Sequence, residues 1–203
     1  MTDDIFSILD RSRAHDGFLK LDRYRVRQRR FDGTETPVLD REVVVAAECV
    51  GVLLYDPIRD AVVLVEQARL VPALMGLAAV QAEIVAGRIE PGDSPIASVH
   101  REVLEETGCI ILGAPELITT VLTSPGYNTE RLHLYCARVD ATVAGGFHGL
   151  AAEHEDIRVL VLSNAEFAQW QAEGRITNLF TASAGLWLAL HRDRLLSSAA
   201  PPR

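Results

Sequence analysis

The order of apolar and polar residues predicts two β-rich regions in the first third of the chain. Residues 18–30 mix aromatic and branched side chains with bases, and an Asp-Gly pair at 32–33 follows, which supplies the positive φ angles of a tight turn. Two β-branched runs, residues 41–55 and 61–70, flank a turn at 56–60 in which proline presets φ. We therefore expect an N-terminal antiparallel unit followed by a largely buried hairpin.

The second half of the chain predicts further strands and two closing helices. Ser163, with Glu166 three residues on, has the pattern of a capping box, and Gly174 supplies a stop for the first helix. The second helix covers about residues 178–191 and presents a leucine-rich face to the core. Strands interleaved with few helices indicate an α/β or α+β sandwich with a mixed sheet. The predicted strands are residues 116–122, 131–139 and 156–162.

Composition and charge narrow the class of protein. The chain has 203 residues, 48% of them apolar and 24% charged, as in an ordinary globular domain. Its net charge of -8 has the wrong sign for neutralising nucleic-acid phosphates or coating an anionic membrane. The arginines of residues 23–30 lie in a run that alternates like a strand, which favours a solvated strand face. We expect no nucleic-acid partner and no membrane partner, and an anionic substrate would need a bridging cation.

Cysteine usage and the start of the chain indicate the compartment. Cys49, Cys109 and Cys136 lie far apart in apolar contexts, which is typical of reduced intracellular thiols. The first ten residues carry acids where an export leader would carry bases. The apolar stretch at 43–54 is interrupted by Glu48 and is too short to cross a bilayer. We expect a cytoplasmic protein.

Residues 83–109 combine a glycine-containing loop with a well-capped helix. Ser94 is a good N-cap, Pro95 suits the first helical position and Gly108 is typical of a C-terminal stop. A helix is therefore predicted over residues 95–107. At about 100° per residue, it has an apolar core stripe and an acidic stripe beside it.

The acidic stripe consists of Glu102, Glu105 and Glu106. Like charges three and four residues apart on a helix repel, so three of them beside a core-facing stripe need a reason. A hard divalent cation such as Mg²⁺, which prefers oxygen ligands, supplies one. A solvated acidic face, partly neutralised by Arg101, is the alternative, and the stripe alone leaves both open.

The spacing of this segment resembles the Nudix box, the signature of the Nudix hydrolases. Two positions depart from the family pattern. Asp93 replaces a glutamate that ties the loop to the box arginine, here Arg101, and Cys109 stands at the final hydrophobic position. The matching positions are Gly87, Arg101, Glu102, Val103, Glu105, Glu106 and Gly108.

The resemblance implies a fold and a chemistry. The fold is the Nudix fold, an α-β-α sandwich with a mixed β-sheet, here with an added N-terminal antiparallel β unit. The chemistry is hydrolysis of a diphosphate with two or three Mg²⁺ or Mn²⁺ ions. Glu102, Glu106 and the carbonyl of Ala86 match metal ligands of the family, and Glu105 matches a catalytic glutamate that supports them.

Outside the box, the chain is similar to bacterial ADP-ribose pyrophosphatases over nearly its whole length. The resemblance rests on the Ser-Pro-Gly segment at 124–126, the acidic run at 148–159 and the strand at 62–70 before the box. It implies Glu153 as catalytic base and Glu155 as a further metal ligand. The residues that it implies in substrate binding are Arg41, Arg69 and Pro125.

The same resemblance implies how the chain is organised. In the family, N-terminal strands exchange between subunits, so a domain-swapped homodimer is expected, with residues 1–44 as the dimerisation segment. Residues 45–196 are then the Nudix hydrolase domain and residues 197–203 a flexible tail. Residues 70–82 are unusually apolar for a loop that often contacts substrate or partner, so specificity could differ there.

Three functions remain to be compared. The favoured one is Mg²⁺-dependent hydrolysis of ADP-ribose, a small nucleoside diphosphate substrate, to AMP and ribose 5-phosphate. The second keeps the chemistry and changes the substrate to another nucleotide sugar such as GDP-mannose. The third is a non-catalytic ligand sensor with a Nudix fold, which the catalytic carboxylates oppose. A hydrolase of oxidised nucleoside triphosphates is disfavoured, because those enzymes lack long N-terminal strands.

Overall fold

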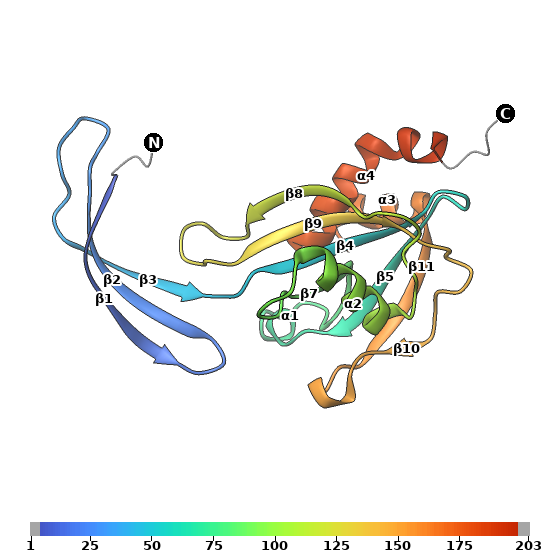
Figure 1. Cartoon of the computed structure of the whole chain (residues 1–203), viewed down its shortest axis with the longest axis horizontal. Helices are drawn as coiled ribbons and strands as arrows, with labels where there is room; N and C mark the ends of the chain where they lie inside the picture. The colour runs from blue at the N-terminus through green and yellow to red at the C-terminus, as the bar shows by residue number, and fades with distance from the viewer. Residues whose placement is uncertain (1–4, 199–203) are drawn as a thin grey trace. The chain divides into compact units, whose positions relative to one another are not determined.

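The computed structural model describes residues 5–198, which divide into two units (Figure 1). Unit 1 takes in the chain up to Glu48 together with Val121–Leu132, and unit 2 takes in Cys49–Thr120 and the chain from His133 onward. The predicted boundary after residue 44 lies within a strand, Leu39–Val45. Each unit is described by itself below.

Unit 1 contains a three-stranded antiparallel sheet in the order β1-β2-β3. The predicted turn at the Asp-Gly pair is present, with Gly33 at φ 84° and Arg30 N donating to Thr34 O at 2.7 Å. Strand β1 is exposed along its length and lacks apolar alternation, which is why the sequence did not predict it. The strands are β1 (Phe6–Asp16), β2 (Lys20–Gln28) and β3 (Leu39–Val45).

The arginines of residues 23–30 lie on the exposed side of β2 and just beyond it. Arg23 Nη2 donates to Glu42 Oε1 at 3.2 Å across the β2–β3 pair, where Arg23 and Glu42 are opposite each other. Cross-strand pairs of opposite charge are a common way to stabilise a solvated sheet face. The expectation of a solvated strand face therefore agrees with the structure.

A larger, eight-stranded sheet forms the centre of unit 2 among the described residues. Its strand order is β10-β11-β5-β4-β9-β8, with β6 paired to β5 and β7 paired to β4. The strands are β4 (Cys49–Asp56), β5 (Ala61–Ala68), β6 (Val80–Glu83), β7 (Val85–Arg88), β8 (Glu116–Leu122), β9 (Arg131–Arg138), β10 (Phe147–His148) and β11 (Ile157–Ser163).

The sequence predicted one strand for the apolar run at 41–55. The structure has two strands there, and they belong to different sheets. Every residue of β4 is buried, whereas β3 is partly exposed. The residues between them, 46–48, leave the strand geometry, so burial changes abruptly within a run that reads as continuous. Apolar content alone cannot separate a strand with two covered faces from one with an open face.

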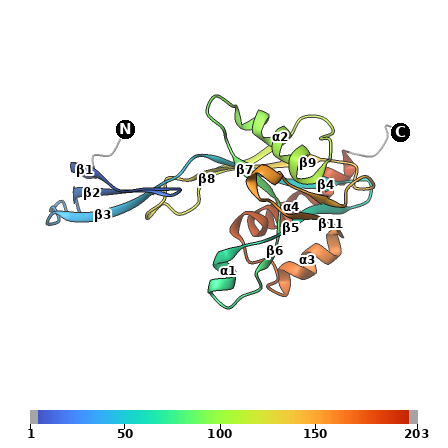
Figure 2. The same cartoon turned by 90° about the horizontal axis from the view of Figure 1, so that it is seen from below.

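Helices cover both faces of the larger sheet (Figure 2). Helix α2 (Pro95–Thr107) lies on one side, and α3 (Asn164–Ala172) and α4 (Leu179–Ser197) lie on the other. The core between α2 and the sheet includes Val52, Val63, Val99 and Val103, each fully buried. This arrangement is the predicted α-β-α sandwich. The remaining helical segments are α1 (Leu70–Leu74) and the 3-10 turn η1 (Ala151–Glu153).

Helix α4 packs on a face other than the one expected. Leu186 and Leu190, taken as core residues, are 67% and 82% exposed. The buried face carries small residues such as Ala184 and Gly185, and a Cβ added at Gly185 would overlap the amide of Gln171 on α3. Close helix approach selects small side chains, so the leucine pattern predicted the wrong face.

Two further expectations concern the ends of helices and of the chain. The capping box of α3 is present, with Ser163 and Glu166 bonded reciprocally. Ser197, assigned to a flexible tail, is the last residue of α4, and the predicted tail beyond residue 198 lies outside the described residues. Within residues 5–198, no helix combines the length and apolarity needed to cross a membrane.

We predict that the contact of α4 with the β4–β5 turn is a pH-dependent part of the stability. Arg192 donates to Asp60 through Nε at 2.9 Å and Nη2 at 2.5 Å, and this hydrogen bonding holds the pKa of Asp60 below its usual range. Arg192→Leu should lower the free energy of unfolding at about pH 7, where the Asp60 carboxylate is ionised. A carboxyl group whose pKa is lower in the folded state stabilises that state at pH values above its unfolded pKa. The difference in the free energy of unfolding between the unaltered protein and Arg192→Leu should therefore vanish as the pH falls through the folded pKa of Asp60.

Urea unfolding at about pH 7 and about pH 3 measures this difference. Arg194→Leu is the matched control, because its ion pair with Glu116 is exposed on both sides and should contribute less than about 0.5 kcal/mol. An equal loss in both variants, or one that persists at low pH, contradicts the prediction.

Candidate active site

Strand β7 and helix α2 bring the Nudix-like residues together. Helix α2 begins where predicted, with Ser94 Oγ accepting from Ala97 N at 3.2 Å, and ends at Gly108 in the left-handed conformation at φ 65°. Val99 and Val103 are fully buried and fix the rotation of the helix. That rotation turns Glu102 and Glu106 toward β7.

A glycine makes room for the first of these carboxyl groups. Glu102 is 8% exposed, and a Cβ added at Gly87 would overlap its carboxyl group. Glycine at this position therefore leaves room for the Glu102 carboxyl where it lies, because an added side chain would displace that group. The sequence identified Gly87 as a matching position of the Nudix box, and the structure gives a physical reason for glycine there.

The second carboxyl group is buried more deeply. Glu106 is 3% exposed and accepts a hydrogen bond from Ala86 N at 3.3 Å. Burial, followed by the charge of Glu102, raises the pKa of Glu106 to about 8. Burial also raises the pKa of Glu102 to about 7. The two groups are thus costly to ionise together without a cation.

Arg101 supports the acidic stripe from its edge. Its Nη1 lies 2.9 Å from Glu102 Oε1 and 3.1 Å from Glu105 Oε2, and its Nη2 donates to Arg88 O at 2.9 Å. The expected pairing with Asp93 is present as a long ion pair, with Nε 3.9 Å from Asp93 Oδ2. That distance exceeds a hydrogen bond, so the shorter aspartate keeps attraction but loses a directed contact.

The loop after β10 contributes a further carboxylate. Glu155 Oε2 accepts from Leu150 N at 3.2 Å, and the Glu155 charge contributes to the raised pKa values of Glu102 and Glu106. Glu155 is therefore close enough to the buried pair for its charge to act on both groups, and its role as a metal ligand stays a prediction. Glu153, the expected base, is exposed at the end of η1. We call Glu102, Glu106 and Glu155 the carboxylate cluster.

The two histidines of this loop differ in setting. His148 is partly buried and its ring contacts Gly145 O at 2.9 Å, whereas His154 is exposed at φ 57°. The ring of His148 also lies near Gly108, where an added Cβ would be 2.9 Å from it.

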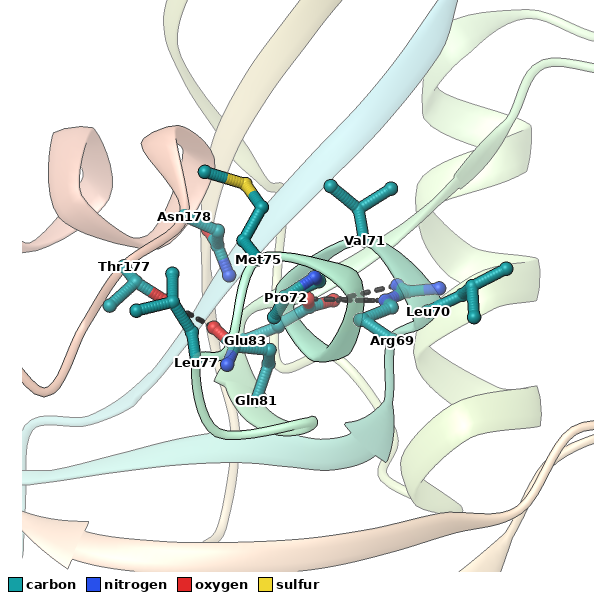
Figure 3. Close-up of a pocket in the computed structure, with 10 residues that line it drawn as sticks. All are labelled: Arg69, Leu70, Val71, Pro72, Met75, Leu77, Gln81, Glu83, Thr177 and Asn178. Atoms are coloured by element: carbon teal, nitrogen blue, oxygen red, sulfur yellow. Dashed lines mark hydrogen bonds and ion pairs between the residues drawn. The ribbon is translucent and has the colours of Figure 1, made fainter.

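Arg69 lies at the end of β5, between the carboxylate cluster and a cavity. Its guanidinium is paired with Glu83, and the charges of Glu106 and Glu155 also help to raise its pKa. Figure 3 shows this pair beside a cavity of about 470 Å³ formed by α1, the loop after it and the start of α4. The apolar segment at 70–82 thus forms a cavity wall and a short helix, where the sequence predicted only a loop.

Two of the expected substrate residues belong to unit 1, whereas the carboxylate cluster belongs to unit 2. Arg41 is on β3, and its Nη1 donates to Asp40 O at 3.0 Å. Pro125 is exposed in a turn closed by Tyr127 N donating to Ser124 O at 3.2 Å. Their roles remain predictions from the resemblance.

The donor set of the cluster fits a hard divalent cation. Across residues 5–198, no three His, Cys, Asp or Glu side chains already converge as metal ligands. Two buried carboxyl groups, one of them over the cradle at Gly87, nevertheless leave oxygen donors close to the Ala86 backbone. Oxygen donors with excess negative charge suit Mg²⁺, which takes few protein ligands and keeps water or phosphate oxygens for the rest.

Glu83 is the residue of this region that sequence reasoning missed. It lies opposite Val65 in the β5–β6 pair and bonds to Arg69 across the connection between these strands. The signal was available in principle, because a hairpin places acids and bases on paired strands. The intervening helix α1 hid the pairing.

Comparison with known proteins agrees with this geometry. A family model described as NUDIX domain matches residues 45–180. The chain belongs to the NUDIX family. It is similar to a curated protein named ADP-ribose pyrophosphatase from Escherichia coli, with 40% identity over 188 residues, 93% of this chain and 90% of that protein.

Other relatives and a solved structure agree in fold and family. An ADP-ribose pyrophosphatase of Haemophilus influenzae is 34% identical over 94% of this chain and 89% of its own length. A GDP-mannose pyrophosphatase of Pectobacterium atrosepticum is 33% identical over 67% of this chain and 69% of its own length. A solved structure titled "Crystal structure of ADP compounds hydrolase" superimposes with a TM-score of 0.70, 17% identity and 96% coverage of both chains. The expected Nudix fold is thereby confirmed.

We predict that Gly87→Ala abolishes most of the hydrolytic activity without unfolding the protein. The added methyl group would displace the carboxyl of Glu102, and a displacement of about 1 Å in a catalytic group typically costs on the order of 100-fold in rate. Steady-state kinetics and thermal unfolding measure the two effects. Gly17→Ala is the control, because there an added Cβ meets only the flexible ring of His15. Full activity in Gly87→Ala contradicts the assignment.

We also predict that the metal-free protein becomes less stable as pH rises. A carboxyl group whose folded pKa lies above its unfolded value binds more protons in the folded state, so the free energy of unfolding falls with pH through that window. For Glu106 the window runs from the ordinary value of 4.5 to about 8. In EDTA, stability should fall by roughly 1–3 kcal/mol between about pH 5 and about pH 9.

Glu106→Gln should remove most of this pH dependence, because glutamine does not ionise. Excess Mg²⁺ should restore the stability of the unaltered protein at high pH through binding to the folded state alone. Urea unfolding at the two pH values measures both effects. Stability that rises with pH in EDTA would show that the two carboxyl groups are not held in a costly environment.

Proposed function

We propose that the chain is a Mg²⁺-dependent ADP-ribose pyrophosphatase that yields AMP and ribose 5-phosphate. The observation that carries this proposal is the buried pair Glu102 and Glu106 beside Gly87 and Ala86, because such a pair has a clear use only with a bound cation. The relatives named ADP-ribose pyrophosphatase, similar over about nine tenths of both chains, supply the substrate.

The proposed metal ligands are the carboxylate cluster and the carbonyl of Ala86. When bound there, two or three Mg²⁺ ions would polarise the diphosphate and lower the pKa of a bound water, and Mn²⁺ could take the same oxygen donors. Glu105 is left outside this set because it matches a supporting position in the family resemblance, and its carboxylate accepts from Arg101 Nη1 at 3.1 Å. We assign Glu105 a supporting role in catalysis through Arg101, which in turn contacts Glu102.

The reaction needs a base and a nucleophilic water. Water adds its oxygen to one phosphorus of the diphosphate while the bond from that phosphorus to the bridging oxygen breaks. The bridging oxygen leaves with the other phosphate, and the proton lost by water goes to a base. We assign that base to Glu153, whose exposed position at the end of η1 leaves its carboxylate free to meet a substrate from solution.

Arginine and proline side chains would hold the rest of the substrate. Arg69 is suited to the diphosphate because its guanidinium is positively charged and its Nη1 lies outside the pair with Glu83, so that it can donate to a phosphate oxygen. Arg41 and Pro125 of unit 1 are proposed to contact the nucleoside part. The exposed apolar side chains of β1, including Phe6 and Ile8 at 55% and 65%, support a domain-swapped homodimer formed through unit 1.

A second substrate is supported by one comparison. Relatives named GDP-mannose pyrophosphatase match about two thirds of this chain, so the same chemistry on another nucleoside diphosphate sugar is the second candidate. The three cysteines are buried and none of them forms a disulfide, which fits a reducing compartment, and we place the enzyme in the cytoplasm.

The test measures product release from a panel of ADP-ribose, GDP-mannose and other nucleotide sugars with Mg²⁺. ADP-ribose should give the highest kcat/KM, and Glu106→Gln should lower kcat by at least about 100-fold while the protein stays folded. Glu116→Gln, an exposed carboxylate paired with Arg194, is the control and should keep full activity. Preferred turnover of GDP-mannose favours the second candidate, and binding without turnover favours a ligand sensor.

A further inference from the structure

We propose that Glu83 is a positioning residue, which holds the Arg69 guanidinium so that substrate affinity depends on a carboxylate that touches no substrate. The inference rests on the proposed function, because Arg69 needs a diphosphate to bind. It adds to that function a residue that is not one of the matching Nudix-box positions, placed on β6 before the proposed metal-binding carbonyl of Ala86.

The contact between the two side chains is a two-pronged ion pair. Arg69 Nε lies 3.1 and 3.2 Å from the two oxygens of Glu83, and Arg69 Nη2 lies 2.6 Å from Oε2. This side-on geometry fixes the plane of the guanidinium as well as its position. The Nη1 group lies outside the pair and is available to a ligand.

The two side chains of the pair differ in burial, so the carboxylate is held in place while the guanidinium remains accessible to solvent. The Glu83 side chain is 12% exposed, whereas that of Arg69 is 44% exposed. Leu70, Pro72 and Leu77 line the same cavity as the ion pair, and Figure 3 shows the pair at its edge. Apolar neighbours lower the local dielectric and strengthen such a pair relative to one in open water.

The backbone holds both residues in register. Ala68 pairs with Val80 and Val65 pairs with Glu83 in the β5–β6 ladder, and Arg69 N donates to Ala79 O at 2.8 Å. Glu83 comes shortly before Ala86 on the same stretch of chain, which continues from β6 into β7. One stretch of backbone therefore carries both the carboxylate that aims Arg69 and the proposed metal-binding carbonyl.

Electrostatics explains why Arg69 needs to be held. Glu106 and Glu155 attract its guanidinium, as their contribution to its raised pKa shows. Without Glu83, the side chain would be drawn toward the carboxylate cluster and would compete there with cations. Glu83 offers a stronger, hydrogen-bonded alternative, so the guanidinium stays beside the cluster as a phosphate ligand.

A double-mutant cycle with Arg69→Ala and Glu83→Gln tests this coupling. Each single variant should raise KM for ADP-ribose about tenfold with kcat changed less than about threefold, since phosphate binding is lost in both substrate and transition state. The double variant should have the KM of Arg69→Ala, because Glu83 acts only through Arg69. Glu83→Asp, which keeps the charge, should recover part of the affinity. Thermal unfolding checks that every variant is folded.

A second ion pair on the same sheet supplies the matched control. Arg158 Nε donates to Glu66 Oε2 at 2.7 Å across β11 and β5, with side-chain exposures of 61% and 15%. Glu66→Gln removes a pair of the same chemistry and should leave KM unchanged. A rise in KM for Glu66→Gln equal to that for Glu83→Gln would contradict a specific role.

Calorimetry on the same proteins measures the dissociation constant of inorganic pyrophosphate from each variant in the presence of Mg²⁺. This measurement separates the role of Glu83 from the proposed ADP-ribose substrate. No turnover of ADP-ribose by the unaltered protein, together with a coupled loss of pyrophosphate affinity, contradicts the proposed substrate and supports the role of Glu83. Losses that multiply in the double variant, or an unchanged affinity in Glu83→Gln, overturn the role of Glu83 whatever the substrate.

Discussion

The arrangement of unit 2 depends on two carboxyl groups that are buried on successive turns of one helix. Glu102 and Glu106 are both nearly buried, and each raises the cost of ionising the other. Packing of Val99 and Val103 into the sheet keeps the helix from rotating them into solvent. The core therefore supplies the free energy that holds an unfavourable charge arrangement in place, as is common where a site must bind a cation.

The neighbouring arginines follow from the same constraint. A guanidinium that settled between Glu102 and Glu106 would neutralise them and take the place of a metal ion. Arg101 instead divides its donors among Glu102, Glu105 and the carbonyl of Arg88. Arg69 is held by Glu83. Arg101 thus neutralises part of the charge of Glu102 from its edge, whereas Arg69 is committed to Glu83, and the Glu106 carboxyl stays beside the Ala86 backbone as an oxygen donor for a cation.

The sequence predicted this site better than it predicted the packing around it. The spacing of Glu102, Glu106 and Gly108, with a proline at the first helical position, depends on local geometry that any α-helix obeys. The buried face of α4 and the break between β3 and β4 depend on what the chain packs against, which a single sequence does not display. Glu83 escaped notice for the same reason, because its partner is close only across paired strands.

The proposed nucleoside contacts and the carboxylate cluster belong to different units. The carboxylate cluster, Arg69 and Glu83 all belong to unit 2, which contains a complete core of its own. Arg41 and Pro125, the proposed nucleoside contacts, belong to unit 1, whose sheet is largely exposed. Exposed strands and turns tolerate substitution better than a packed core does. A change of nucleotide sugar can therefore arise in unit 1 while the buried carboxylates stay as they are, so relatives named for ADP-ribose and for GDP-mannose can share one hydrolytic site.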